Sequence, residues 1–471
     1  MLAILLLTSA LRIYGLADES LWLDEALVDV RISKDYQSLL TDWDSKRQGP
    51  LYPIIAKAWC DQFGDDEFNL RFTAALLGIL AVFAIYRLGK ELFGYSAGIW
   101  AALLSALNPF LVYFSQEARP YTLFILCSTF SVLYFVRILR GASIQDNILF
   151  VLSTIGALYS HPYGPFLIVT HFLMVIGLLW SERESLRVAL RRIWISMLSV
   201  LLLYTPMLYI FTQTFLQKIE KPTVAGSWLV HRPIIQVWET ICDYFMNPVF
   251  GIALCAFIIA VIGMKLWRDK KFGFPLTVLL SLALSFLLVP WIISALITPI
   301  YLYKYTAPAI VVFLILAGYA LSLIPWKPRI AALVVLIALN LWPLYENYTR
   351  VDKDPWRQTV AYLNANLQAH DMILLDPTYA SSPFRYYYQD RKDVLYRRLR
   401  FLAEFREVPG HIQRVWFVFA HFHTPLAGED VYNKLTEWGN PEDTIHMTET
   451  LPMNPDRYFA SEIDITRFDR K

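Results

Sequence analysis

The stretch Phe274-Pro-Leu-Thr-Val-Leu-Leu-Ser-Leu-Ala-Leu-Ser-Phe-Leu-Leu-Val-Pro-Trp-Ile-Ile-Ser-Ala-Leu-Ile-Thr298 contains no charged residue. A helix needs about 20 mainly apolar residues to cross a hydrocarbon core of about 30 Å, so this stretch is long enough to span a membrane. Ten further segments have the same character. The predicted spans cover residues 1–16, 72–93, 97–114, 121–139, 147–160, 164–180, 194–215, 248–266, 274–298, 305–324 and 330–345.

The composition agrees with a polytopic, mostly α-helical membrane protein. Of the 471 residues, 56% are hydrophobic and 17% are charged, whereas soluble domains carry about 25% charged residues. The formal net charge is +2 and no long basic run is present, so we predict membrane lipids, and not nucleic acid, as partners. Residues 1–16 lack a positively charged start and a small-residue cleavage site, so we interpret them as an uncleaved first span.

The distribution of Lys and Arg predicts the orientation of the chain in a cell inner (plasma) membrane. Cytoplasmic loops are enriched in Lys and Arg. Five short loops on one side of the predicted spans carry such residues, whereas residues 17–71 on the other side hold 12 Asp and Glu against 6 Lys and Arg. We therefore expect a cytoplasmic N-terminus, with the first loop and the C-terminal region outside the cytoplasm. The basic loops contain Arg87 and Lys90; Arg137 and Arg140; Arg183, Arg187, Arg191 and Arg192; Arg268, Lys270 and Lys271; and Lys327 and Arg329.

Two regions differ from a plain helix bundle. The outer loop 17–71 is far longer than the usual helix connection of 2–8 residues, and its apolar spacing predicts amphipathic helices at the membrane surface. Residues 346–471 read as a small extracytoplasmic α/β domain, with helices near 356–367 and 431–438 and strands at 372–375 and 414–420. We therefore predict a membrane module over residues 1–345, which includes the active-site loop, and a soluble domain after it.

The segment Ser20-Leu-Trp-Leu-Asp24-Glu25-Ala26 follows the first predicted span. Ser20 can cap the next helix, and acids in its first turn complement the helix dipole. A second interpretation is catalytic, because desolvation at the membrane surface raises carboxylate pKa values. Helical neighbours diverge by about 100°, so Asp24 and Glu25 cannot face one atom together. We expect one to act as a general base and the other to support it.

Cations and aromatic residues collect at the outer span ends. They include Arg119 and Tyr121 at 115–121, His161 at 159–164, and Lys304 and Tyr305 at 299–305. Each has a structural explanation, because Lys and Arg extend toward the interface and Tyr is common there. Together they would form an anion site that faces the carboxylate base.

Residues Gln48-Gly49-Pro50-Leu51-Tyr52 lie where the outer loop returns to the membrane. Gly-Pro is a turn signal. A functional interpretation is that the segment forms a wall of the substrate site, with Tyr52 as a binding residue.

A combination of motifs resembles the GT-C membrane glycosyltransferases, family 39-like enzymes related to protein O-mannosyltransferases and to the bacterial aminoarabinose transferase of lipid A. The similarity is closest over about the first 170 residues. Many relatives have His-Pro-Pro-Leu at residues 48–51, so the resemblance implies no role for Gln48. Relatives often have Arg-Tyr at residues 304–305, and Lys304 keeps the cationic character there. The motifs are Leu21–Ala26, Gly49–Tyr52, Arg71, Gly78, Leu88–Gly94, Asn108–Phe110, Tyr113–Tyr121 and Asp354-Pro-Trp356-Arg357.

The resemblance implies a GT-C fold and a reaction. Such enzymes transfer a sugar, with inversion, from a polyprenyl-phosphate carrier to a hydroxyl of a glycan, lipid or protein acceptor outside the cytoplasm. Asp24 would be the catalytic base, Glu25 its neighbour, and Arg119 a ligand of the carrier phosphate. The phosphate of a lipid carrier lies at the membrane interface, where cations at the ends of the spans can reach it without a glycine-rich loop. The leaving phosphate needs charge stabilisation more than a proton. No His or Cys cluster has metal-ligand spacing, so we predict no dedicated metal site; a divalent cation shared with the donor phosphate is the alternative.

Three other functions compete with this prediction. A secondary transporter or lipid flippase would show charges within the spans, broken helices and an internal repeat, whereas these spans are nearly uncharged and no repeat is visible. A binding or assembly protein could use the C-terminal region to recruit a partner. A glycan ligase that uses a diphosphate-linked donor is the nearest enzymatic alternative.

Overall fold

The computed structural model describes residues 1–41, 49–141, 143–181, 186–220, 233–269, 273–349, 353–389, 391–398, 408–420, 425–448 and 462–471. The chain forms two compact units. Unit 1 comprises residues 1–14, 35–62 and 71–345, and unit 2 comprises residues 15–34, 63–70 and 346–471. The predicted boundary after residue 345 coincides with the start of the last piece of unit 2. Residues 15–34 and 63–70, which the prediction assigned to the membrane module, make their contacts within unit 2.

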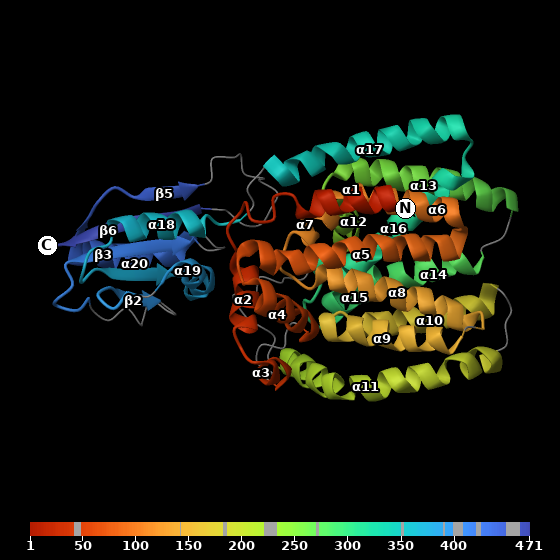
Figure 1. Cartoon of the computed structure of the whole chain (residues 1–471), viewed down its shortest axis with the longest axis horizontal. Coiled ribbons are helices and arrows are strands. Elements are labelled where there is room, and N and C mark those ends of the chain that lie inside the picture. The colour runs from red at the N-terminus through yellow and green to blue at the C-terminus, as the bar shows by residue number, and fades with distance from the viewer. Residues whose placement is uncertain are drawn as a thin grey trace. The chain divides into compact units, whose positions relative to one another are not determined.

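Unit 1 is helical, and each of the eleven predicted spans falls on a helix or a broken helix (Figure 1). Within it α8 packs against α9, α6 against α16, and α10 against α14. The helices of this unit and its connections are α1 (Leu2–Ile13), α3 (Tyr36–Thr41), α4 (Leu51–Phe63), α5 (Glu67–Phe93), α6 (Tyr95–Leu107), α7 (Pro109–Ser115), α8 (Tyr121–Leu139), α9 (Ile144–Ser160), α10 (Pro165–Ser181), α11 (Leu186–Glu220), α12 (Ile235–Asp243), α13 (Pro248–Asp269), α14 (Phe274–Ala283), η1 (Leu284–Leu288), α15 (Val289–Leu296), η2 (Tyr303–Ala309), α16 (Ile310–Leu323) and α17 (Trp326–Thr349).

Seven helices of the described residues are long and apolar enough to cross a membrane, or eight if one bent pair counts as a span. The chain is thus a multi-pass membrane protein. The full number of eleven stays a prediction, because α1, α9 and α10 are shorter than the 18 residues that such a test requires. The orientation also stays a prediction. Amphipathic helices were predicted in the first loop, and helices α2 (Leu23–Ile32), α3 and α4 occupy its described part.

The span predicted over residues 97–114 is a broken helix. Helices α6 and α7 meet at an angle of 61°. Asn108 has an extended backbone because Pro109 disfavours the helical conformation of the residue before it. Its Oδ1 accepts a hydrogen bond from Leu111 N (2.9 Å), and its Nδ2 donates to Tyr244 O (3.0 Å). The break is therefore a capped, specified feature of the fold.

The core of unit 2 is a six-stranded mixed sheet in the order β2-β1-β3-β6-β4, with β5 on β6. Strand β1 pairs in parallel with β2 and β3, and β6 is antiparallel to its neighbours. The strands are β1 (Met372–Asp376), β2 (Leu395–Arg398), β3 (Arg414–Ala420), β4 (Gly439–Pro441), β5 (Ile445–Thr448) and β6 (Glu462–Arg470), and the other helices are α18 (Trp356–Asn366), η3 (Thr378–Ala380), α19 (Ser381–Tyr387) and α20 (Pro425–Trp438).

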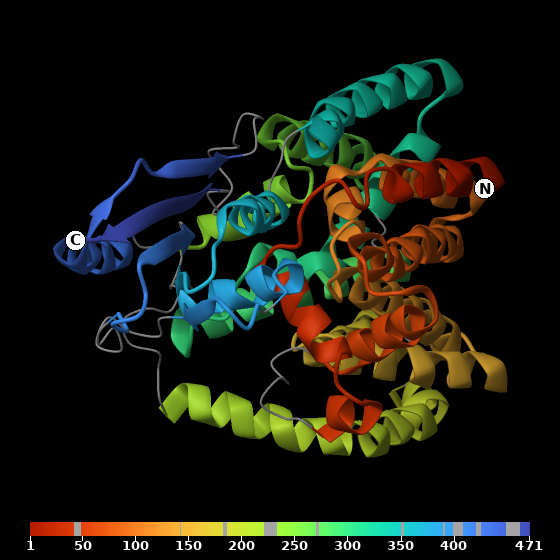
Figure 2. The same cartoon turned by 60° about the vertical axis from the view of Figure 1, so that its left-hand side comes forward.

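Alternating side chains of the central strands bury both faces of this sheet. Ile373 and Val418 pack with α18 and α19 on one face. Leu374 and Phe417 pack with α20 on the other. Figure 1 and the turned view in Figure 2 show α18, α19 and α20 next to the strands of this sheet. The predicted small α/β domain is confirmed: β3 has its predicted bounds, and α20 begins before the predicted residue 431.

Candidate active site

Helix α2 presents the two acids of the first outer loop in its first turn. Trp22 is the N-cap residue, and no side chain caps the helix. The prediction that Ser20 caps this helix was wrong, because Ser20 lies two residues before the cap position. Its Oγ instead accepts a hydrogen bond from Arg357 N (3.1 Å) and donates to Gln358 Oε1 (3.3 Å). Ser20 therefore satisfies a backbone donor in the first turn of α18.

Asp24 and Glu25 have different environments. The side chain of Glu25 is completely buried and forms an ion pair with Lys353 Nζ at 3.2 Å. Lys353 is also buried, and Glu19 lies 3.7 Å from it. Asp24 is partly exposed. A buried carboxylate in an ion pair is fixed in place, so Glu25 suits a supporting role and Asp24 an acting one; both roles stay predictions.

The motif Asp354-Pro-Trp356-Arg357 holds the start of unit 2 together. Trp356 is fully buried in the sheet core, and its Nε1 donates to Asp354 Oδ2 (3.3 Å). Burial raises the pKa of Asp354 to about 7. Arg357 Nη2 donates to Ala17 O (2.9 Å) and to Glu67 Oε1 (2.7 Å). The motif thus ties the segment that precedes α2 to α18.

In unit 1, two predicted cations approach one aromatic ring. The guanidinium carbon of Arg119 lies 5.7 Å from the centroid of Tyr121, and Lys304 Nζ lies 5.9 Å from it. Arg119 and Tyr121 are buried. A cation near a ring face is stabilised by the ring quadrupole and keeps its charge. The structure therefore brings together two of the cations that the sequence predicted as an anion site.

His161 lies in the same aromatic cluster. Its ring stacks on Phe124, with centroids 4.9 Å apart, and lies 5.9 Å from Tyr121 and 5.0 Å from Tyr305. Nδ1 accepts a hydrogen bond from Tyr163 N (3.1 Å), so the proton of the neutral ring is assigned to Nε2. Burial, together with the charges of Arg119 and Lys304, lowers the pKa of His161 to about 3. His161 is therefore a neutral donor at physiological pH.

An arginine of the first helix anchors the turn that carries Arg119. Arg12 is fully buried. Its Nε donates to Ser115 Oγ (3.1 Å), and its terminal nitrogens donate to the carbonyls of Ala106 and Ser105 (both 3.2 Å), at the end of α6. Gln116 Nε2 donates to Tyr14 O (2.7 Å). Arg12 was not predicted as a functional residue. The one indication of such a role in the sequence is a charged residue near the end of an otherwise apolar span.

The segment 49–52 packs closely on the chain before His161. A Cβ atom at Gly49 would lie 2.0 Å from the backbone oxygen of Tyr159, so only glycine permits this approach. Tyr52 is buried, and its hydroxyl shares a hydrogen bond with Thr73 Oγ1 (3.3 Å). Its predicted role in substrate binding is untested, and Gln48 lies outside the described residues.

No three His, Cys, Asp or Glu side chains in the part of the chain that the structure describes are arranged to hold a metal ion. Lys353 is the other residue that was not predicted. Its partner Glu25 lies more than 300 positions away, and a single lysine beside the Asp-Pro-Trp-Arg motif gives no signal of that contact.

Comparisons with known proteins find a family model that matches part of the chain and solved structures that share its fold. Residues 47–210 match the family described as dolichyl-phosphate-mannose-protein mannosyltransferase. No curated protein matches the chain by sequence. ArnT from Cupriavidus metallidurans, in a crystal structure bound to undecaprenyl phosphate, is similar with a TM-score of 0.61 and 12% identity, over 99% of this chain and 97% of that chain.

The oligosaccharyltransferase of Archaeoglobus fulgidus is also similar, with a TM-score of 0.56 and 12% identity, over 88% of this chain and 67% of that chain. At such identities these structures establish the fold. The predicted resemblance to GT-C membrane proteins related to protein mannosyltransferases is confirmed.

Proposed function

We propose that this chain, which is similar to GT-C membrane proteins, transfers a sugar from a polyprenyl-phosphate carrier to an acceptor hydroxyl. The sequence match over residues 47–210 supports the reaction class. The similar ArnT protein was crystallised with undecaprenyl phosphate bound, which supports a carrier of that class here.

The observation that carries the proposal is the convergence of Arg119 and Lys304 on the ring of Tyr121, beside neutral His161. Two cations in a buried aromatic cluster can bind the phosphate of a lipid carrier, which reaches the site from the membrane. Charge stabilisation is strongest where water is excluded. We assign the carrier phosphate to Arg119 and Lys304, with Tyr121, His161 and Tyr305 as neighbouring donors or ring surfaces and Tyr52 as a further substrate-binding residue.

Asp24 is the proposed general base. It accepts the proton of the acceptor hydroxyl while that oxygen attacks the anomeric carbon from the face opposite the phosphate. The bond between this carbon and the phosphate oxygen breaks, and the carrier phosphate leaves with the electron pair. The new glycosidic bond therefore has the inverted configuration. The buried pair of Glu25 and Lys353 would hold α2 so that Asp24 keeps its orientation.

We infer the direction of insertion from the basic loops, which favour a position outside the cytoplasm for α2 and the sheet domain. Nucleotide sugars are not available there, so a lipid-linked donor is required. The acceptor is a hydroxyl of a glycan, a lipid or a protein. A divalent cation shared between the donor phosphate and the site is compatible with this chemistry.

Reconstitution with two donors tests the function. Radiolabelled sugars are supplied on undecaprenyl phosphate or on undecaprenyl diphosphate to the full-length protein in vesicles with an envelope extract as acceptor. We expect label to enter the acceptor fraction from the monophosphate alone, and Asp24→Asn to abolish this transfer. Transfer from the diphosphate alone would establish a glycan ligase. Movement of intact donor across the bilayer without transfer would establish a flippase.

A further inference from the structure

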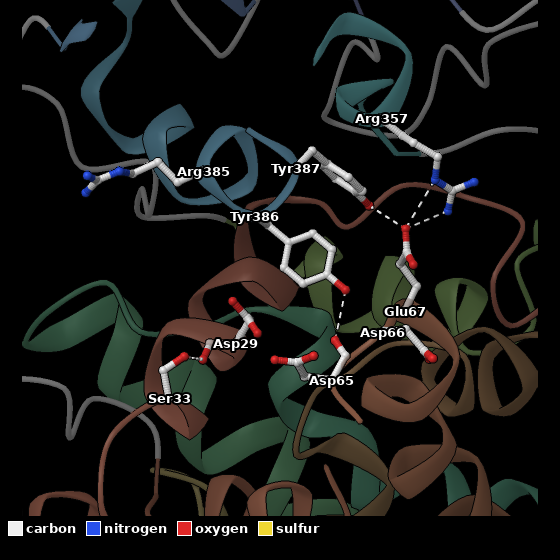
Figure 3. A pocket seen from close by; sticks show the side chains of 9 residues that line it. All are labelled: Asp29, Ser33, Asp65, Asp66, Glu67, Arg357, Arg385, Tyr386 and Tyr387. Carbon is white, nitrogen blue, oxygen red and sulfur yellow. Dashed lines mark hydrogen bonds and ion pairs between the residues drawn. The ribbon is translucent and has the colours of Figure 1, made fainter. Parts of the chain in front are cut away.

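Unit 2 contains a hollow of about 540 Å³ that the reaction scheme does not use. It lies between α2, the turn before α5, the start of α18 and α19 (Figure 3). Its volume falls in the range of small-molecule sites, about 300–1,000 Å³. Aliphatic side chains do not line it, which differs from a lipid or cofactor site. The lining residues are Asp29, Ser33, Asp65, Asp66, Glu67, Arg357, Arg385, Tyr386 and Tyr387.

Internal hydrogen bonds fix one wall of the hollow. Glu67 Oε1 accepts hydrogen bonds from Arg357 Nη2 (2.7 Å), Arg357 Nε (3.2 Å) and the hydroxyl of Tyr387 (3.0 Å). The Tyr387 hydroxyl also accepts a hydrogen bond from Leu21 N (2.8 Å). These contacts hold the carboxylate of Glu67 in one orientation. The wall is therefore preorganised, which reduces the free-energy cost of binding.

A second set of bonds fixes the turn before α5. Asp66 caps α5, since its Oδ1 accepts from Asn69 N (2.9 Å) and its Oδ2 from Asn69 Nδ2 (3.2 Å). The Tyr386 hydroxyl donates to the backbone oxygen of Asp65 (2.9 Å). This bond holds the ring of Tyr386 above the carboxyl groups of Asp29 and Asp65 (Figure 3).

Among the partly buried acids of the hollow, Asp29 lacks such hydrogen bonds; Asp65 is exposed. The side chain of Asp29 is half-buried. Ser33 Oγ donates to the backbone oxygen of Asp29 (3.0 Å), and among the described residues no donor or cation is seen at its carboxylate oxygens. Burial, followed by the nearby charge of Asp65, raises the pKa of Asp29 to about 6. Withdrawing a carboxylate from water without supplying a partner has a free-energy cost, and hydroxyl donors from a ligand would remove it.

We propose that this hollow binds one sugar residue of a glycan. Carboxylate acceptors, arginine donors, tyrosine hydroxyl oxygens and the partly exposed ring of Tyr386 match a ligand whose hydroxyls both donate and accept. A lone metal ion fits less well, because no three suitable ligands converge among the described residues. An apolar ligand would leave the half-buried carboxylate of Asp29 without a hydrogen-bond partner.

The geometry of α2 separates this sugar from the reacting one. At 100° per residue, Asp29 lies about 140° around the helix from Asp24, and Ser33 lies about 180° from it. The hollow and Asp24 therefore belong to different faces of the same helix. The bound sugar is a remote residue of a glycan whose other end reacts. This identification of the glycan as acceptor rests on the proposed function; the binding itself does not.

An array of immobilised bacterial envelope oligosaccharides tests the proposal with the full-length protein in detergent and without donor. We expect wild type to bind at least one oligosaccharide class and Asp29→Ala to bind it about tenfold more weakly. Asp393→Ala removes an exposed acid of the same unit outside the hollow and should bind like wild type. Tyr386→Ala, which removes the ring, should also weaken binding.

Asp24→Asn separates this proposal from the proposed function, since it should lose transfer but bind the oligosaccharide like wild type. Asp29→Ala should fold, because it removes a half-buried carboxylate that has no described partner. No binding by wild type, or equal binding by wild type and a folded Asp29→Ala, would overturn the proposal. Loss of binding in Asp24→Asn would overturn the separation of the two sites.

Discussion

The two units hold their charged side chains in different ways. In unit 1, Arg119 and Lys304 approach the ring of Tyr121. In unit 2, Glu25 and Glu67 form ion pairs with Lys353 and Arg357. A ring stabilises a cation without neutralising it, whereas an ion pair commits a carboxylate to its partner. The second arrangement suits a rigid support for α2, and the first places two cations beside the ring where we propose that the carrier phosphate binds.

The largest expected effect concerns this support. Lys353→Met leaves Glu25 as a buried carboxylate without its counter-ion, which typically destabilises a protein by about 3–5 kcal/mol. We expect chemical denaturation of unit 2 at a lower denaturant concentration. The double variant Glu25→Met, Lys353→Met restores most of the stability, because replacing both partners removes the unpaired charge. If the double variant is as unstable as Lys353→Met, the unpaired charge of Glu25 is not the cause of the destabilisation.

Arg119→Ala tests the other side of the comparison. We expect the affinity for polyprenyl phosphate to fall about 10- to 100-fold, because charge-assisted hydrogen bonds to phosphate are strong. Lys304→Ala should have a similar effect, and Arg140→Ala, at the far end of α8, should have none. Equilibrium binding of a fluorescent polyprenyl phosphate measures this. If Arg119→Ala binds polyprenyl phosphate like wild type, Arg119 does not bind the carrier phosphate and only anchors its turn.

His161 gives the unit 1 cluster a pH dependence. Its pKa is about 3 in the folded protein and about 6.5 when unfolded. The unfolded state therefore binds more protons between these values, so stability is complete above about pH 6.5 and falls as the pH is lowered, by up to about 1.4 kcal/mol per pH unit. Unfolding of wild type and His161→Gln from pH 7 to pH 5 should show a shallower slope in the variant. Equal slopes would mean that His161 is accessible to protons in the folded protein.

The smallest effect concerns Ser20. Ser20→Ala removes the side chain that accepts from Arg357 N in the first turn of α18, and loss of a cap costs about 1 kcal/mol. Thermal unfolding should shift accordingly, and Ser33→Ala, on an exposed turn of the same segment, is the matched control. A shift as large in the control would remove the special role of Ser20.

Local sequence patterns predicted most of the helices and the central strands. Strand β3 was predicted with its observed bounds because Val415 to Ala420 form a nearly continuous apolar run, as buried strands do. Strand β6 was not predicted, although Ile463 and Ile465 alternate with polar residues as in a half-buried strand. Short polar strands such as β2 have no comparable signal.

The sequence indicated which residues belong to the candidate site, but it did not indicate which residues they contact. Asp24, Arg119, His161 and Lys304 stand out because polar groups at span ends are conspicuous. The ion pair of Glu25 and Lys353 joins segments more than 300 residues apart, and the hollow around Asp29 draws its walls from four segments. Such contacts follow from tertiary packing, which a single sequence does not encode in any local pattern.

Single-turnover transfer by Asp24→Asn, with donor affinity measured on the same sample, tests the central claim most directly. General-base catalysis contributes about 10²–10⁴-fold to a rate. The variant should therefore bind the polyprenyl-phosphate sugar like wild type and transfer it at least about 100-fold more slowly. Transfer at the wild-type rate by a folded variant would contradict the assignment of Asp24 as the base.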